Sequence, residues 1–299
     1  MIANFYIIPE SIKNDNLTDE QFLSSLDNFI SEYYKILEFK EENKIIIQEN
    51  IYEITLPNGN TLADFLYSPD VPLEGKQIAI KKFLSSIFSK LSHEQININD
   101  IKEQIAHNSL DNCYGIISLT EIEEIANENQ IIYDKGSWLK FRRHHLGLFF
   151  GDSKYFIDEC KKYFSELFFH DNNYNSVGKI LDGFSSKIII HLVALNDKLP
   201  DILKKSNTFK NHTDLLNYFS RESSLEEDAT LQGSDKGKLK FSFINEDNNM
   251  EDVICEPHMK LCSNDSSDGH YYYNRIYFYF GKKSIEKSKI LVGHIGVHI

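Results

Sequence analysis

The chain has 299 residues, 41% of them hydrophobic and 13% aromatic, a composition typical of globular domains and not of a disordered chain. Its formal net charge is −13, which excludes a general basic surface for nonspecific binding to nucleic acid. The four cysteines are scattered with no C-x-x-C pair, which argues against a zinc ribbon and a disulfide framework.

The sequence has neither the charged and apolar regions of a signal peptide nor an apolar run of about 18 residues. We therefore expect a soluble, cytoplasmic protein with no membrane partner. Walker A, G-x-G-x-x-G, G-x-S-x-G and H-E-x-x-H motifs do not occur. ATPase, dinucleotide oxidoreductase and serine hydrolase functions therefore lack their main sequence support.

Residues 1–135 are predicted to form an N-terminal α/β region of unknown role. Thr18, with Gln21 three residues later, is typical of a capping box that begins a helix. The predicted segments are a strand at 4–9, a β-branched segment at 43–56, a strand at 113–119, and helices at 18–40, 76–91, 97–107 and 120–129.

Residues 136–225 are predicted to be a helical middle region. Its helices are expected at 153–168, 179–195, 201–205 and 213–221, with a polar linker at 171–176. Arg142 and Arg143, next to two histidines, are candidates for a phosphate-binding patch. The alternative for these two arginines is a solvated helix face.

Residues 226–299 are predicted to form a C-terminal sheet domain, which gives an α+β fold class overall. Four strands are expected at about 239–244, 252–262, 271–280 and 289–298, in a four-stranded antiparallel sheet. From Arg275 onward the chain has five basic residues and one acidic residue, so this end tolerates a polyanion better than the rest.

Polar side chains alternate with apolar ones along the last three predicted strands. Because successive side chains of a strand point to opposite faces, we expect the polar ones to converge on one face of the sheet. A slip of one residue in the pairing would instead direct them into the core. The polar set is Glu256, His258 and Lys260, then Arg275, Tyr277 and Tyr279, then His294 and His298.

About 60 residues of this region resemble the RelE superfamily of bacterial toxin endoribonucleases, and the YoeB branch most closely, whose pattern is a helical start followed by a curved antiparallel sheet. The resemblance rests on three short motifs and covers only the C-terminal part of the chain. They are Glu256-Pro257-His258-Met259-Lys260, Arg275-Ile276-Tyr277-Phe278, and the apolar strand from Ile290 to Ile299 with His294 and His298. Lys260 lies one place further from the glutamate than in the family pattern, and Ile299 stands where the family has an aromatic residue.

The resemblance implies metal-independent cleavage of RNA with no cofactor. Glu256 would act as general base, Arg275 as phosphate clamp, and His298 or His294 as general acid. Lys260 would add positive charge, and Tyr277 or Tyr279 would stack on a base. His258 belongs to the same candidate catalytic set.

Several alternatives remain open for these residues. Glu256 and Lys260 fit a solvated charge pair, Arg275 fits structural stacking on tyrosine, and the histidines fit surface positions. Asp252, Glu256 and Lys260 have the residue types of a metal-dependent PD-(D/E)xK nuclease, although Glu and Lys are too far apart along the chain. A transition-metal site from His258, His294, His298 and Glu256 is chemically feasible.

The sequence therefore predicts a nuclease, and most specifically an endoribonuclease, a hydrolase that cleaves RNA. Its expected role is that of a bacterial toxin or an antiviral defence effector. The second hypothesis is a non-enzymatic module whose sheet face binds RNA, a nucleotide or a partner protein. RNA is the expected substrate. An inhibitory or activating protein partner and an oligomer are both compatible with the large N-terminal part.

Overall fold

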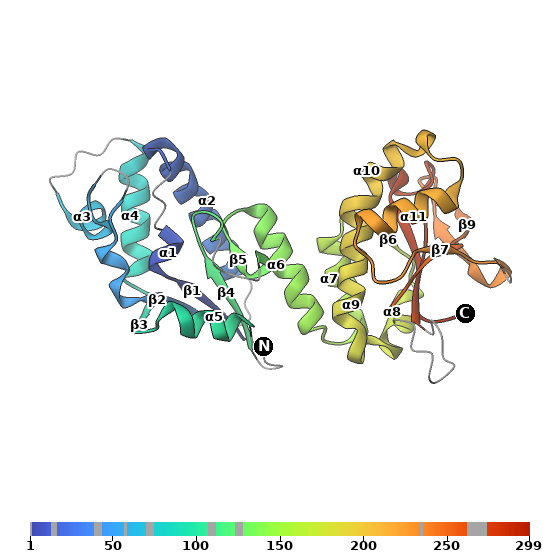
Figure 1. The fold of residues 1–299 in the computed structure, drawn as a ribbon, viewed down its shortest axis with the longest axis horizontal. Helices are drawn as coiled ribbons and strands as arrows, with labels where there is room; N and C mark the ends of the chain where they lie inside the picture. Colours follow the sequence, from blue (N-terminus) through green and yellow to red (C-terminus); the bar gives the residue numbers. More distant parts are fainter. Residues whose placement is uncertain are drawn as a thin grey trace. The chain divides into compact units, whose positions relative to one another are not determined.

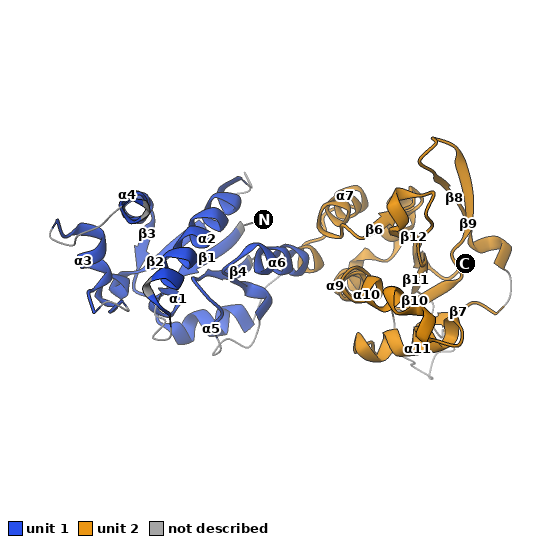
Figure 2. Ribbon diagram, turned by 90° about the horizontal axis from the view of Figure 1, so that it is seen from above, with its two compact units in different colours: residues 1–145 blue, residues 146–299 orange. Residues whose placement is uncertain are grey.

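The structure is a computed structural model that describes residues 2–12, 17–38, 44–56, 59–69, 75–106, 112–122, 128–233, 236–261 and 274–299. It confirms the α+β class. The chain forms two compact units, unit 1 with residues 1–145 and unit 2 with residues 146–299 (Figure 2). No helix within these described ranges is long and apolar enough to cross a membrane.

Unit 1 contains a five-stranded parallel sheet with the strand order β3-β2-β1-β4-β5 (Figure 1). The strands are β1 (Ile2–Ile7), β2 (Lys44–Gln48), β3 (Ser92–Glu94), β4 (Asn112–Ile117) and β5 (Ile131–Ile132). The helices are α1 (Pro9–Ile12), α2 (Asp19–Glu38), α3 (Leu62–Tyr67), α4 (Lys76–Phe88), α5 (Ile98–Ala106) and α6 (Lys135–Leu148). The parallel pairing agrees with the alternation of strands and helices along the chain.

Helices cover both faces of this sheet. Tyr6 packs in one apolar cluster with Ile101 of α5, whereas the neighbouring Phe5 points the other way and meets Phe141 of α6 at a ring distance of 5.1 Å. Gly115 on β4 permits this approach, since a Cβ there would lie 3.0 Å from the Phe5 ring. The capping box expected at the start of α2 is present.

Two hydrogen bonds make up that capping box. The Thr18 amide donates to Gln21 Oε1 at 2.9 Å, and the Gln21 amide donates to Thr18 Oγ1 at 3.3 Å. The helix expected at 120–129 falls in part on residues outside the described ranges, and residues 128–130 form a short 3-10 turn.

Unit 2 contains a mixed five-stranded sheet with the order β6-β12-β11-β10-β7. The strands are β6 (Leu167–Phe169), β7 (Thr230–Leu231), β10 (Pro257–Lys260), β11 (Asn274–Tyr279) and β12 (Ile290–Val297). β12 is parallel to β6 and antiparallel to β11, so the expected fully antiparallel four-stranded sheet is corrected to a mixed one. Residues 262–273, including the start of the strand expected at 271–280, lie outside the described part.

A separate antiparallel ladder contains the strand expected at 239–244 and the start of the one expected at 252–262. It pairs β8 (Lys240–Ile244) with β9 (Met250–Ile254) and shares no hydrogen-bonded neighbour with the five-stranded sheet. The single strand expected at 252–262 is therefore two, because the chain leaves β9 after Ile254 and starts β10 only at Pro257. Proline removes a donor from the ladder, which suits the first position of a strand.

Two different layers cover the faces of the unit 2 sheet. The helices α7 (Ser153–Tyr163), α9 (Leu181–Val193), α10 (Leu199–Lys204) and α11 (His212–Glu222) pack on the face of Met259, Ile276 and Ile295, and the short α8 (Asn173–Ser176) follows β6. The β8–β9 ladder packs on the opposite face, where Phe241 and Phe243 meet Tyr277 and Leu291.

The expected division into three regions differs from this arrangement. The helical middle at 136–225 forms no unit of its own: α6 begins in unit 1, and the helices from residue 146 onward share one apolar core with the sheet strands of unit 2. The linker expected at 171–176 contains α8, which lies against β12.

Candidate active site

Three strands of unit 2 bring most of the predicted polar residues to one face. His258 pairs with Tyr277, and Tyr277 pairs with His294, so these three side chains form a row across β10, β11 and β12. The neighbouring row contains Lys260 and Arg275. A bulge between Tyr277 and Phe278 shifts the pairing with β12 beyond this point.

His258 is held in its neutral form inside the sheet. It is 3% exposed, and its ring contacts Thr230 Oγ1 through Nε2 at 3.0 Å and the Glu256 carbonyl through Nδ1 at 3.3 Å. Since a carbonyl only accepts, Nδ1 carries the proton and Nε2 accepts from the Thr230 hydroxyl. Burial, with a smaller effect of Arg275, lowers the pKa of His258 to about 4. Neither nitrogen is available for proton transfer to a ligand.

His294 has the same character. Its Nε2 donates to the carbonyl of Val297 at 2.9 Å, and its Nδ1 accepts from Asn172 Nδ2 at 3.1 Å. The residue is 6% exposed, and burial holds its pKa below the ordinary value. The role of general acid expected for His294 therefore lacks a nitrogen that could carry it out.

The two tyrosines also differ from the expectation that they stack on a base. Tyr277 has no exposed surface, and its ring lies between His258 at 5.2 Å and His294 at 6.0 Å. Tyr279 is half-buried against the β8–β9 ladder. Tyr277 therefore supports the site from beneath and does not meet a ligand.

His298 is the exposed histidine of the predicted set. It follows β12, and its ring meets the edge of Tyr277 at 6.4 Å. Partial burial, and then the positive charges of Arg275 and Lys238, hold the pKa of His298 below its ordinary value of 6.5. An exposed imidazole that is neutral near pH 7 can accept a proton from a ligand.

Arg275 lies beside this imidazole and is oriented by its neighbours. Its Nη1 donates to Gln232 Oε1 at 3.0 Å and to the Tyr277 hydroxyl at 3.2 Å. Part of the Arg275 side chain stays accessible. These two bonds hold the planar guanidinium in a defined orientation.

The two other charged residues of the set have ion-pair partners. Glu256 Oε1 lies 2.8 Å from Lys236 Nζ, and Lys260 Nζ lies 3.8 Å from Glu227 Oε2. Glu256 and Lys260 therefore do not pair with each other as the solvated-pair alternative assumed. Glu227 belongs to the acidic run 226–228, which the sequence suggests is a solvated loop, and Lys236 was not singled out in the sequence.

Arg142 and Arg143 do not form the expected phosphate-binding patch. Both lie on α6 in unit 1 and are 4% exposed, so the alternative of a solvated helix face is wrong as well. The Arg142 guanidinium lies over the Trp138 ring at 5.7 Å.

A pocket with a volume of about 450 Å³ opens beside the polar face of the sheet in unit 2. Its polar lining consists mainly of His170, Asn172, Ser176, Lys179, Lys238 and His294. None of the described residues that line it is acidic. In a chain of net charge −13, this local excess of cations favours an anionic ligand.

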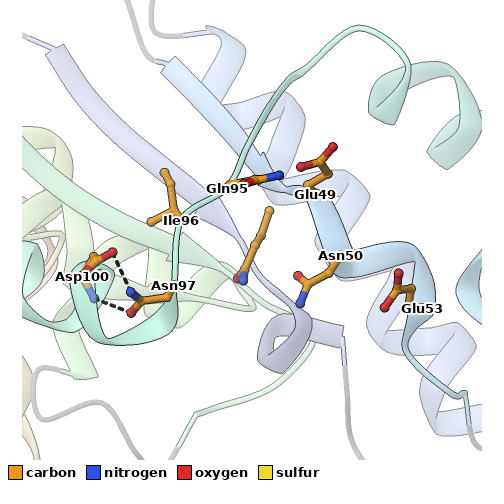
Figure 3. Close-up of a pocket in the computed structure, with 8 residues that line it drawn as sticks. Glu49, Asn50, Glu53, Gln95, Ile96, Asn97 and Asp100 are labelled. Atoms are coloured by element: carbon orange, nitrogen blue, oxygen red, sulfur yellow. Dashed lines mark hydrogen bonds between the residues drawn. The ribbon is translucent and has the colours of Figure 1, made fainter.

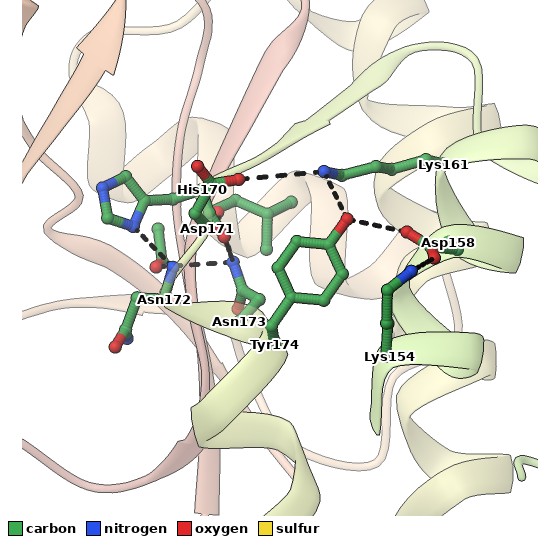
Figure 4. Close-up of polar contacts among 10 residues, drawn as sticks. Lys154, Asp158, Lys161, His170, Asp171, Asn172, Asn173 and Tyr174 are labelled. Carbon is green, nitrogen blue, oxygen red and sulfur yellow. Dashed lines mark hydrogen bonds and ion pairs between the residues drawn. The ribbon is translucent and has the colours of Figure 1, made fainter. Parts of the chain in front are cut away.

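The segment that follows β6 forms one wall of this pocket and is tied to its surroundings (Figure 4). Asn173 Nδ2 donates to the Val292 carbonyl of β12 at 2.9 Å, and the Asn172 amide donates to His170 Nδ1 at 3.1 Å. The Tyr174 hydroxyl donates to Asp158 on α7 at 2.7 Å. Sequence reasoning missed this wall because its polar composition is that of a linker.

The donors proposed for a metal site do not assemble. Asp252 lies on β9 and bonds to Lys240 at 2.6 Å and to Ser242 at 2.5 Å, in a different ladder from Glu256 and Lys260. Within the described ranges, no group of three or more His, Cys, Asp or Glu residues is arranged to hold a metal ion.

Unit 1 has a concavity of its own, of about 540 Å³, where β2 and β3 end (Figure 3). Its lining is rich in amides and carboxylates, including Glu49, Glu53 and Asp100. Asn97 and Asp100 bond to each other at the start of α5, where Asn97 Nδ2 donates a hydrogen bond to Asp100 Oδ2 at 2.8 Å. This surface is chemically unsuited to phosphate.

No protein-family model, no curated protein and no solved structure matches the chain. The chemistry of the site in unit 2 is therefore the basis for assigning a function.

Proposed function

We propose that unit 2 is a metal-independent endoribonuclease whose reacting groups are His298 and Arg275. The observation that carries this proposal is the grouping of an exposed, neutral imidazole with the Arg275 guanidinium and Lys238, next to a pocket whose described lining residues include no acidic one. RNA supplies its own nucleophile, the 2′-hydroxyl, so a base and a set of cations are sufficient for cleavage.

In this mechanism His298 takes the proton of the 2′-hydroxyl. The 2′-oxygen attacks the adjacent phosphorus, the bond from phosphorus to the 5′-oxygen breaks, and a 2′,3′-cyclic phosphate forms. The 5′-oxygen leaves and takes a proton from solvent. Arg275 and Lys238 stabilise the negative charge that accumulates on the phosphate oxygens in the transition state.

This division of roles differs from the one that the family resemblance implies. We assign the base role to His298, and not to Glu256, because the lowered pKa of His298 keeps it neutral near pH 7 and because Glu256 pairs with Lys236 at 2.8 Å. We further propose that the cleavage serves a toxin or phage-defence effector, and that unit 1 regulates it or binds a partner.

The test is incubation of the purified full chain with single-stranded RNA and with duplex DNA, each with and without EDTA. We expect cleavage of RNA that persists in EDTA and leaves 2′,3′-cyclic phosphate ends. In His298→Ala the rate should fall by about 10²–10⁴-fold, the usual contribution of one general base. His212→Ala, which removes an exposed histidine on α11, is the matched control and should cleave like the original chain.

Other results would contradict the proposal in different ways. Cleavage abolished by EDTA would favour a metal-dependent nuclease. RNA binding by the original chain without any cleavage would favour the non-enzymatic module. Toxicity of the overproduced chain that His298→Ala does not relieve would remove the proposed role as a toxin.

A further inference from the structure

One pocket residue has a buried polar atom with no hydrogen-bond partner among the described residues. Ser176 is 7% exposed and lines the pocket, and its Oγ makes no hydrogen bond. A buried hydroxyl without a partner is unfavourable, so such groups are usually completed by a ligand or by ordered water. The Ser176 hydroxyl therefore indicates a position in the pocket where a hydrogen-bonding group of a ligand can bind.

Neighbouring side chains give this part of the pocket a fixed shape. Asn172 is oriented by its bond to His294 Nδ1 at 3.1 Å, and that ring is in turn fixed by the Val297 carbonyl at 2.9 Å. Gly296 leaves room for this packing, because a Cβ there would lie 2.8 Å from His294 Nε2. A ligand that enters therefore meets groups that are already in place, which reduces the entropic cost of binding.

The charge of the pocket identifies the class of ligand. Its described charged residues are Lys179 and Lys238, and both are exposed. The positive charge of Lys179 lowers the pKa of His294, and the positive charge of Lys238 lowers the pKa of His298. Ammonium groups at the rim with hydroxyl and amide groups inside match the oxygens of a phosphate. The imidazoles are neutral and add no charge of their own.

Lys238 also connects this pocket to the reacting groups. It lines the pocket and acts electrostatically on His298, so a phosphate in the pocket would lie beside the phosphate that Arg275 holds. We infer that the pocket of Ser176, Lys179 and Lys238 binds a phosphate group, namely the phosphate of RNA that neighbours the one cleaved. Binding of phosphate as such follows from the pocket alone, whereas its place in RNA rests on the proposed function.

The experiment titrates the full chain with inorganic phosphate, with a nucleoside 3′-phosphate, and with a short RNA made uncleavable by a 2′-deoxy residue, following affinity by calorimetry. We expect Lys179→Ala and Lys238→Ala each to weaken phosphate binding about tenfold, as the loss of a charge-assisted hydrogen bond does. Ser176→Ala should weaken it by a smaller factor. Lys204→Ala, at an exposed lysine of α10, is the matched control and should bind like the original chain.

Circular dichroism of each variant separates a loss of binding from a loss of folding. Competition between the uncleavable RNA and phosphate supports the assignment to RNA, and failure to compete would overturn it. Equal binding by the original chain and by the Lys179 and Lys238 variants would overturn the site altogether. Phosphate binding that depends on both lysines in a chain that cleaves no RNA would support the phosphate site and contradict only the nuclease.

Discussion

The histidines of the site differ in what surrounds each ring, and this difference sets their protonation. Burial lowers the pKa of His258 to about 4, from an ordinary value of 6.5. We expect proton NMR to show a His258 ring that titrates near this value, well below the ordinary value of 6.5. A His258 ring that titrates near 6.5 would contradict its burial between β7 and β11.

The same shift makes the stability of unit 2 depend on pH. In the unfolded chain His258 takes up a proton near its ordinary pKa of 6.5, whereas in the folded chain it does so only near pH 4. The stability of unit 2 is therefore fully present above the ordinary pKa and falls as the pH drops toward the folded pKa. Between about pH 7.5 and pH 5 this histidine should remove about 2 kcal/mol of unfolding free energy. Urea unfolding at both pH values should show a smaller loss in His258→Gln.

The pH dependence of cleavage should report on His298. Because the base must be neutral, kcat/KM should fall as the pH drops through the pKa of His298, which lies below 6.5. Lys238→Ala removes one of the charges that lower this pKa, so the midpoint should move upward. Lys204→Ala should leave it in place, and a midpoint that ignores Lys238 would argue against His298 as the base.

At this scale, sequence alternation placed the polar residues on a common face but did not distinguish buried from exposed ones. His258, Tyr277 and His294 have the spacing of catalytic residues, yet they form a buried row in which each histidine ring has both nitrogens bonded. The partners that decide this, Thr230 and Asn172, come from segments distant in the chain. Periodicity within one strand holds no information about them.

At the scale of elements, long periodic segments were predictable and short apolar ones were not. The hydrophobic periodicity of the sequence predicted the helix α2 and the strands β11 and β12. The first two residues of β6 were assigned to the preceding helix, because a short apolar run fits a helical stripe as well as a strand. The parallel pairing of β6 with β12 became recognisable only from the tertiary structure.

The contact between the β8–β9 ladder and the sheet depends on a glycine of β12. A Cβ at Gly293 would lie 2.6 Å from the Phe241 ring and 2.8 Å from Cys255 Sγ. We expect Gly293→Ala to destabilise unit 2 by about 1–3 kcal/mol, the usual cost of overpacking. Gly233→Ala, where a Cβ would meet no atom within 4 Å, is the control in urea unfolding. Equal stability of both variants would contradict the packing of the ladder on the sheet.

At the scale of the whole molecule, a chain of net charge −13 has a small cationic region around Arg275, Lys179 and Lys238. RNA should therefore be attracted by a few charges only. The slope of log affinity against log salt should be about −1 to −2, at roughly −0.7 for each phosphate contacted on a single strand. A much steeper slope, measured by fluorescence anisotropy with uncleavable RNA, would indicate a wider basic surface than this one.

The position of β12 between β6 and β11 has a consequence for the synthesis of the protein. β6 is the first strand of its sheet to leave the ribosome, but its hydrogen-bonding partner is the last. Until β12 emerges, β6 has no strand to pair with and is separated from β11, whereas all the strands of unit 1 have by then been made. The sheet of unit 2 therefore stays incomplete until nearly all of the unit has been made, and we expect its unpaired strand edges to favour aggregation during that time.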